Sequence, residues 1–138
     1  MSIGLIIALV LIAVVAVYFV IALRRMKRMQ VPTSEKVVVL NVTNFDHQTK
    51  QGITLVDFWA TWCMPCKVMV PALNDVAEEL DGRVKVGKVD VDQNKSLAAK
   101  FKVRNIPTIV LLKDGKEINR FVGVKDKNFL LKQLKDVL

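Results

Sequence analysis

The sequence predicts an α/β domain with a mixed central β-sheet flanked by helices, preceded by one N-terminal transmembrane helix. Residues 3–23 form an uncharged apolar run of bilayer-spanning length. Beyond residue 35, short β-branched runs alternate with segments whose apolar residues recur at helical spacing. The last two strand-like runs flank Asp114-Gly115, a two-residue signal for an antiparallel hairpin. Strand-helix-strand repeats followed by a hairpin indicate a sheet of mixed direction.

The N-terminal run from Ile3 to Leu23 has no charge and no proline. At about 1.5 Å per residue, such a helix crosses a hydrocarbon core roughly 30 Å thick. A cleaved signal peptide is the alternative, but its apolar region usually spans about 7 to 15 residues after a basic start. This run is longer, and Met1-Ser2 carries no basic side chain. We therefore expect a retained single-pass anchor that contacts the lipid bilayer through residues 3–23.

The positive charge of the chain is concentrated after the apolar run. The formal net charge is +8, and four of the 21 basic residues lie within residues 24–28, which leaves +4 for the remainder. Basic residues beside a membrane span favour the cytoplasmic side, so we expect a cytoplasmic domain, with an extracytoplasmic one as the alternative. The absence of an aromatic-interleaved basic motif in the sequence argues against nucleic-acid binding.

The expected organisation is an anchor over residues 1–24, a basic juxtamembrane tether over 25–34 and the α/β domain over 35–138. The domain's first strand is predicted over residues 37–42. Thr43 or Asn44 is expected to cap the short helix that follows, near residues 45–50.

The central strand is predicted over residues 54–59, whose apolar, β-branched and aromatic side chains suit burial on both faces. The helix after it has apolar residues at helical spacing, namely Met69, Leu73, Val76, Ala77 and Leu80. A strand over 84–91 precedes a helix near 96–101 that Asn94 is expected to cap. The last predicted elements are strands over 108–112 and 116–122 and a helix from Asp126 that buries Phe129, Leu130, Leu134 and Val137.

Both cysteines lie between the central strand and the helix after it, as Cys63 and Cys66. A cysteine at a helix N-terminus faces unpaired N–H groups and partial positive charge, which favour the thiolate. Two intervening residues let one sulfur reach the other, so the pair indicates a dithiol redox centre rather than inert core thiols. A zinc site needs four ligands, and the chain has two cysteines and His47, while a haem motif needs histidine where Lys67 stands. We expect no metal and no organic cofactor.

Several motifs around the cysteines occur together in a characteristic order and spacing: Val56-Asp57-Phe58-Trp59-Ala60, Trp62-Cys63-x-Pro65-Cys66-Lys67, Pro71, Lys88 to Asp92, Ile106-Pro107-Thr108, Asp114-Gly115 and Gly123. With these motifs the chain resembles the thioredoxin family from about Lys36 to Leu138, and the resemblance implies the thioredoxin fold. Met64 departs from the family, where glycine is usual between the cysteines.

The resemblance also implies catalytic roles. Cys63 would be the exposed nucleophile that attacks a substrate disulfide, and the buried Cys66 would resolve the mixed disulfide, leaving a Cys63–Cys66 bond. Asp57 would be the buried proton acceptor behind the pair, and Lys88 would modulate it. An aspartate bonded to backbone at a strand end is the simpler alternative for Asp57.

The substrate-binding surface follows from the same resemblance. Pro107 would follow a cis peptide bond and pack against the cysteine pair, offering the adjacent backbone to an extended substrate. The surrounding contact residues would be Trp62, Met64, Pro65, Ile106 and Gly123.

The implied function is a protein disulfide reductase that cycles a Cys63–Cys66 dithiol at the membrane surface. Its partners would be disulfide-containing proteins and an electron donor, either a thioredoxin reductase or a membrane carrier. One alternative is an extracytoplasmic membrane-anchored thiol reductase for cytochrome maturation or envelope disulfides. Another is a non-catalytic thioredoxin-fold binding module, which would have no need of a dithiol.

Overall fold

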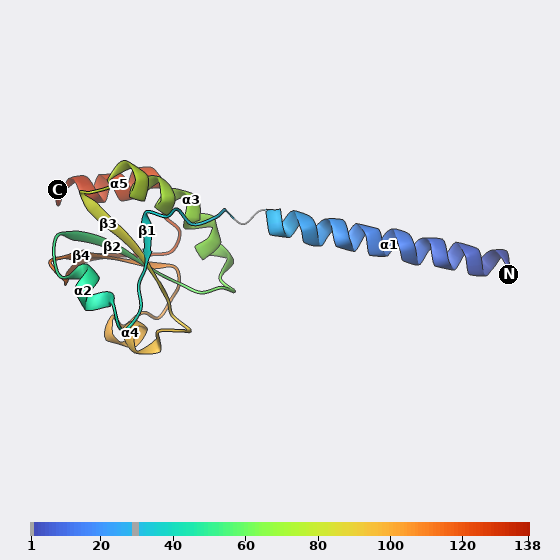
Figure 1. Ribbon diagram of the computed structural model, residues 1–138, viewed down its shortest axis with the longest axis horizontal. Helices are drawn as coiled ribbons and strands as arrows, with labels where there is room; N and C mark the ends of the chain where they lie inside the picture. The colour runs from blue at the N-terminus through green and yellow to red at the C-terminus, as the bar shows by residue number, and fades with distance from the viewer. Residues whose placement is uncertain (1, 29–30) are drawn as a thin grey trace. The chain divides into compact units, whose positions relative to one another are not determined.

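The computed structural model describes residues 2–28 and 31–138, and the chain divides into two units at Val31 and Pro32 (Figure 1). The first unit is the helix α1 (Ile3–Arg28). Its stretch Ile3–Arg25 has a mean hydropathy of 3.3 and is a candidate membrane span by length and composition. The predicted tether over residues 25–34 includes residues 29 and 30, which lie outside the described residues.

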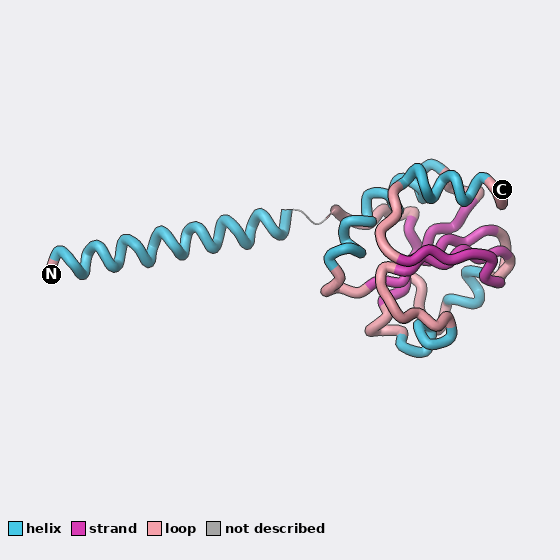
Figure 2. Tube along the Cα trace, turned by 180° about the vertical axis from the view of Figure 1, so that it is seen from behind, coloured by secondary structure: helices cyan, strands magenta, loops and turns pink. Residues whose placement is uncertain are grey.

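The second unit is built on a five-stranded sheet with the order β1-β3-β2-β4-β5 (Figure 2). Its strands are β1 (Val37–Val39), β2 (Ile53–Trp59), β3 (Val84–Asp90), β4 (Thr108–Lys113) and β5 (Lys116–Val122). Strand β3 pairs in parallel with both β1 and β2, whereas β4 runs antiparallel to β2 and β5 antiparallel to β4. The predicted mixed sheet is therefore confirmed.

Helices cover both faces of this sheet. They are α2 (Phe45–Thr49), α3 (Met64–Glu79), α4 (Lys95–Lys100) and α5 (Lys127–Lys135). Figure 1 shows α3 and α5 together on one face and α2 and α4 on the other. The strand order places β2 at the centre of the sheet, and the helices cover it on both faces.

The side chains of β2 alternate between two hydrophobic clusters. Leu55 packs with Met69 of α3 and Leu130 of α5, while Phe58 belongs to the opposite cluster with Phe45 of α2. All of these side chains are buried. Burying a large apolar side chain contributes about 1.5 to 3 kcal/mol. The continuous apolar run of β2 is thus explained by a core on each side of the sheet.

Two local predictions near β1 are wrong. The strand ends at Val39 instead of residue 42, because Asn41 Oδ1 accepts the N–H of Asn44 at 3.1 Å and turns the chain. Neither Asn44 nor Asn94 makes a side-chain cap to the helix that follows it. Asn94 Oδ1 instead accepts the Val42 N–H at 3.1 Å. A long-range partner has therefore replaced the local one.

The predicted hairpin and the start of the last helix are present. Asp114 and Gly115 adopt φ angles of 51° and 78°, the left-handed conformation that a tight two-residue hairpin requires. Asp126 caps α5 by accepting the Phe129 N–H at 2.8 Å. Phe129 and Val137 are partly buried rather than buried, while the other two apolar residues predicted for that helix are in the core.

Candidate active site

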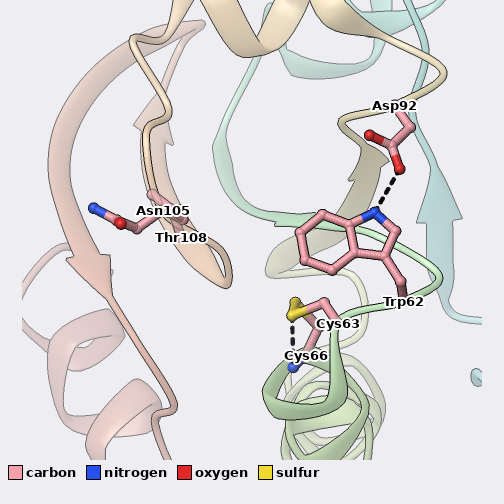
Figure 3. Close-up of a disulfide and its surroundings, with 6 residues drawn as sticks. All are labelled: Trp62, Cys63, Cys66, Asp92, Asn105 and Thr108. Carbon is pink, nitrogen blue, oxygen red and sulfur yellow. Dashed lines mark hydrogen bonds between the residues drawn. A yellow bond between two sulfur atoms is a disulfide. The ribbon is translucent and has the colours of Figure 1, made fainter.

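The cysteine pair lies where β2 leads into α3 (Figure 3). Cys63 is the N-cap of α3, and its Sγ accepts the Cys66 N–H at 3.2 Å. The two sulfurs are bonded, with the Cα atoms 5.3 Å apart. Pro65 occupies the first turn, where its missing N–H leaves no hydrogen bond unmade. This geometry allows the pair to cycle between disulfide and dithiol.

Both cysteines are buried in the oxidised pair. Cys63 is 4% exposed and Cys66 is 2% exposed. The expectation of an exposed Cys63 is therefore wrong for the disulfide form. The pair forms a cluster with Ala60, and the partly buried Trp59 and Ile106 pack against it. A partner must consequently approach Cys63 past these apolar side chains.

The electrostatic environment of Cys63 comes from the N-terminus of α3. The first turn of that helix contains no acidic side chain, and its 16 residues align their peptide dipoles behind the N-cap. The partial positive charge at a helix N-terminus stabilises an anion within the first turn. The arrangement favours a thiolate at Cys63 once the disulfide is reduced.

Asp57 lies on β2, which precedes the cysteine pair in the sequence, and is 4% exposed. Its register partners are Lys88 on β3 and Ile109 on β4. Among the described residues, Asp57 Oδ1 has no hydrogen-bond partner. Burial raises the pKa of Asp57 to about 7, against a smaller opposing effect of the Lys88 charge. The carboxyl group can therefore exchange a proton near neutral pH.

Lys88 is half-buried, and its ammonium reaches two groups. Its Nζ lies 4.9 Å from the centroid of the Trp59 ring and donates to Thr33 Oγ1 at 2.9 Å. Burial lowers the pKa of Lys88, and the negative charge of Asp57 opposes that change. The structure thus places Lys88 beside Asp57, where the sequence resemblance puts it.

The loop before β4 contributes the predicted proline. The Ile106–Pro107 peptide bond is cis, as the resemblance implies. Pro107 O accepts the Gly123 N–H at 2.9 Å, and Thr108 Oγ1 donates to Asn105 O at 2.5 Å. Ile106 packs against the cysteine cluster. Three of the predicted substrate-contact positions therefore lie close together at this loop.

Two large apolar side chains beside the cysteines are exposed. Trp62 is 67% exposed and Met64 is 64% exposed. The Trp62 Nε1 donates to Asp92 Oδ2 at 2.8 Å, which fixes one edge of the indole (Figure 3). Asp92 is itself held in the β3–α4 loop, where its N–H donates to Asp90 Oδ1 at 2.9 Å. An exposed but oriented indole is suited to contact with a partner.

Two contacts of the site have no signal in the local sequence. Asp92 meets Trp62 across 30 positions, and Thr33 meets Lys88 across 55 positions. The sequence alone indicates no role for Asp92 or Thr33. Within the part of the chain that the structure describes, no group of three or more His, Cys, Asp or Glu side chains could hold a metal ion.

Comparison with known proteins gives consistent matches. A sequence model of the thioredoxin family matches residues 36–136. The thioredoxin of Staphylococcus saprophyticus is 46% identical over 94 residues, which cover 68% of this chain and 90% of that protein. The thioredoxin of Staphylococcus haemolyticus is 45% identical over 98 residues, which cover 71% of this chain and 94% of that protein. The family model begins at residue 36 and therefore does not include the N-terminal helix.

Proposed function

This chain belongs to the thioredoxin family and is a thiol-disulfide oxidoreductase with the thioredoxin fold, and from that premise we propose that it reduces protein disulfides at a membrane surface. The observation that supports this most directly is the bonded Cys63–Cys66 pair at the N-terminus of α3. Asp57, buried on the neighbouring strand with a pKa near 7, adds a group for proton transfer.

In the proposed first step, the Cys63 thiolate attacks one sulfur of a substrate disulfide. A sulfur-sulfur bond forms between Cys63 and the substrate, and the other substrate sulfur leaves as a thiolate. The N-terminus of α3 stabilises the attacking anion. The thiolate population of Cys63 is thereby raised.

In the second step, Cys66 transfers its proton to Asp57 and attacks the Cys63 sulfur. The second substrate sulfur leaves as a thiolate, so two electrons pass to the substrate and the Cys63–Cys66 bond forms again. Lys88 adjusts the proton affinity of Asp57 through its charge. A thioredoxin reductase or a membrane electron donor then returns two electrons to the pair.

Substrates would dock on the apolar surface around Cys63. The proposed contacts are Trp62, Met64, Pro65, Ile106, Pro107 and Gly123. The high exposure of Trp62 and Met64 supports this role, because large exposed apolar side chains often mark interaction sites. The backbone beside Pro107 would pair with an extended segment of the substrate, as the family resemblance implies.

The membrane attachment rests on the N-terminal helix. The apolar stretch Ile3–Arg25 has the length and composition of a single span. Arg24 and Arg25 lie at its C-terminal end, which favours a cytoplasmic redox domain. We accordingly assign residues 1–24 to the anchor, 25–34 to a tether and 35–138 to the thioredoxin domain.

Reduction of insulin by the full-length protein in detergent micelles, with dithiothreitol as donor, tests the activity. Cys63→Ser should lose all turnover, because the attacking sulfur is gone. Cys66→Ser should also stop turnover but should accumulate a mixed disulfide with the substrate, visible on a non-reducing gel. An inactive wild type would favour the binding-module alternative, and turnover that survives in Cys63→Ser would refute Cys63 as the nucleophile.

Membrane sidedness is tested by a membrane-impermeant thiol reagent added to cells after mild reduction. We expect Cys63 to react in permeabilised cells and not in intact ones. Equal labelling in intact cells would place the domain outside the cytoplasm, in favour of the extracytoplasmic reductase. Cys63→Ser serves as the control for labelling of other proteins.

A further inference from the structure

The ammonium of Lys88 is held by partners on two different segments, the strand β2 and the segment before β1. Lys88 is the cross-strand partner of Asp57 on β2, and its Nζ lies 4.9 Å from the centroid of the Trp59 ring. Its hydrogen bond goes to Thr33 Oγ1 at 2.9 Å and not to the Asp57 carboxylate. Thr33 belongs to the short segment that precedes β1 and follows the apolar helix in sequence.

The segment around Thr33 is fixed by side chains of α3. Asn74 Nδ2 donates to Pro32 O, and Asn74 Oδ1 accepts the Ser34 N–H, each at 2.8 Å. The Ser34 hydroxyl also donates to the Glu78 carboxylate. One amide side chain therefore binds the backbone on both sides of Thr33. The position of the Thr33 hydroxyl is set by α3 and not by the local chain alone.

We propose that Thr33 is a positioning residue for the redox reaction, whose hydroxyl holds the Lys88 ammonium beside Asp57, so that the segment after the membrane helix supports proton transfer from Cys66. This inference rests on the proposed role of Asp57 as the proton acceptor. Thr33 acts through Lys88, the partner that its hydroxyl binds.

The physical reason is competition with water for the ammonium. A lysine ammonium is strongly hydrated and sits on a flexible stem, so an ammonium without partners moves into solvent. The Thr33 hydroxyl and the Trp59 ring together offset that tendency. While Lys88 stays near Asp57, its charge favours the carboxylate, the form that can accept a proton.

The charged neighbours of Asp57 are few among the described residues. From β3 comes Lys88, whereas the β4 partner is the apolar Ile109. The thiols at the start of α3 titrate when the pair is reduced, so the measurement uses the oxidised protein. In the oxidised protein, a substitution at Thr33 changes the titration of Asp57 by changing the position of the Lys88 ammonium.

The test is a carboxyl-carbon NMR titration of Asp57 in the oxidised full-length protein in micelles, using ¹³C-labelled aspartate. Lys88→Met should move the Asp57 midpoint upward by about one pH unit. Thr33→Val should move it upward by part of that amount, and Thr33→Ser, which keeps a hydroxyl, should titrate like the wild type. Asn74→Ala should move it in the same direction as Thr33→Val, because the segment is released from α3.

A double variant decides whether Thr33 acts through Lys88. In a Lys88→Met background, Thr33→Val should cause no further change. An unchanged midpoint in Thr33→Val, an equal shift in Thr33→Ser, or a shift that persists without Lys88 would each overturn the proposal. An unchanged midpoint in Asn74→Ala would overturn the role given to the docked segment.

The pH profile of insulin reduction separates this proposal from the proposed function. If Asp57 accepts the proton from Cys66, the acid limb of turnover in Thr33→Val moves upward with the NMR midpoint. A moved midpoint with an unmoved turnover limb would refute Asp57 as the proton acceptor while leaving the Thr33–Lys88 contact established.

Discussion

Replacing Asp57 by asparagine should stabilise the protein in a pH-dependent manner. The pKa of this carboxyl group rises from 3.8 to about 7 on folding, chiefly because of burial. That change is about three pH units, and at about 1.4 kcal/mol per unit it corresponds to about 4 kcal/mol. The free energy in question is the cost of keeping an ionised Asp57 in the folded state at pH 8.

The sign follows from proton binding in the two states. Between pH 4 and pH 7 the unfolded chain has released the proton of Asp57, whereas the folded chain still holds it. The folded state therefore binds more protons, and the free energy of unfolding falls as pH rises through this window. Asparagine carries no charge at any of these pH values. The advantage of Asp57→Asn should thus grow from pH 4 to pH 7 and level off above it.

Urea unfolding of residues 32–138, which contain their own core, measures this difference by tryptophan fluorescence. The asparagine amide would be buried without a full set of hydrogen-bond partners. This lowers the free energy of unfolding of the variant by about 1 to 3 kcal/mol at every pH. The informative quantity is therefore the gain at pH 8 minus the gain at pH 4.5. Asp75→Asn on the exposed face of α3 is the matched control and should show little such difference. A gain that is independent of pH would refute the assignment of a raised pKa to Asp57.

The same variant should slow catalysis even though it stabilises the fold. Without the carboxylate, Cys66 loses its proton acceptor, and turnover that depends on Cys66 should fall near neutral pH. Insulin reduction measured from pH 6 to pH 8 checks this expectation. Full activity of Asp57→Asn across that range would remove the proton-acceptor role.

Three further substitutions address packing and partner contact. Met64→Gly removes an exposed apolar side chain beside Cys63 and should change the relative reduction rates of different protein disulfides; an unchanged rate ratio would exclude Met64 from the contact surface. Gly87→Ala would place a Cβ 2.4 Å from Leu40 Cδ1, so the free energy of unfolding should fall by about 1 to 3 kcal/mol in urea titrations, and an undiminished value would show that Leu40 repacks freely. Asp92→Ala removes the acceptor of the Trp62 indole and should raise KM for a protein disulfide more than it lowers kcat; the reverse pattern would argue against a docking role for Trp62.

The sequence by itself determined the elements whose signals are local. The buried strand β2 was predicted from its apolar run, and the hairpin from Asp114-Gly115, because periodicity and turn chemistry act over a few neighbouring residues. The spacing of Cys63 and Cys66 likewise specified a redox pair, since two intervening residues place the second sulfur within bonding reach of the first.

Tertiary structure decided what depends on distant partners. Strand β1 ends earlier than predicted, where Asn41 turns the chain, and the Val42 N–H then binds Asn94 Oδ1, 52 positions away. The burial of Cys63, the proton affinity of Asp57 and the orientation of Trp62 all depend on which strands and loops are neighbours in the sheet. Desolvation and charge interactions act through space, so their strength at Asp57 is set by the packing of β2 against β3, β4 and the helices, which no short window of sequence contains.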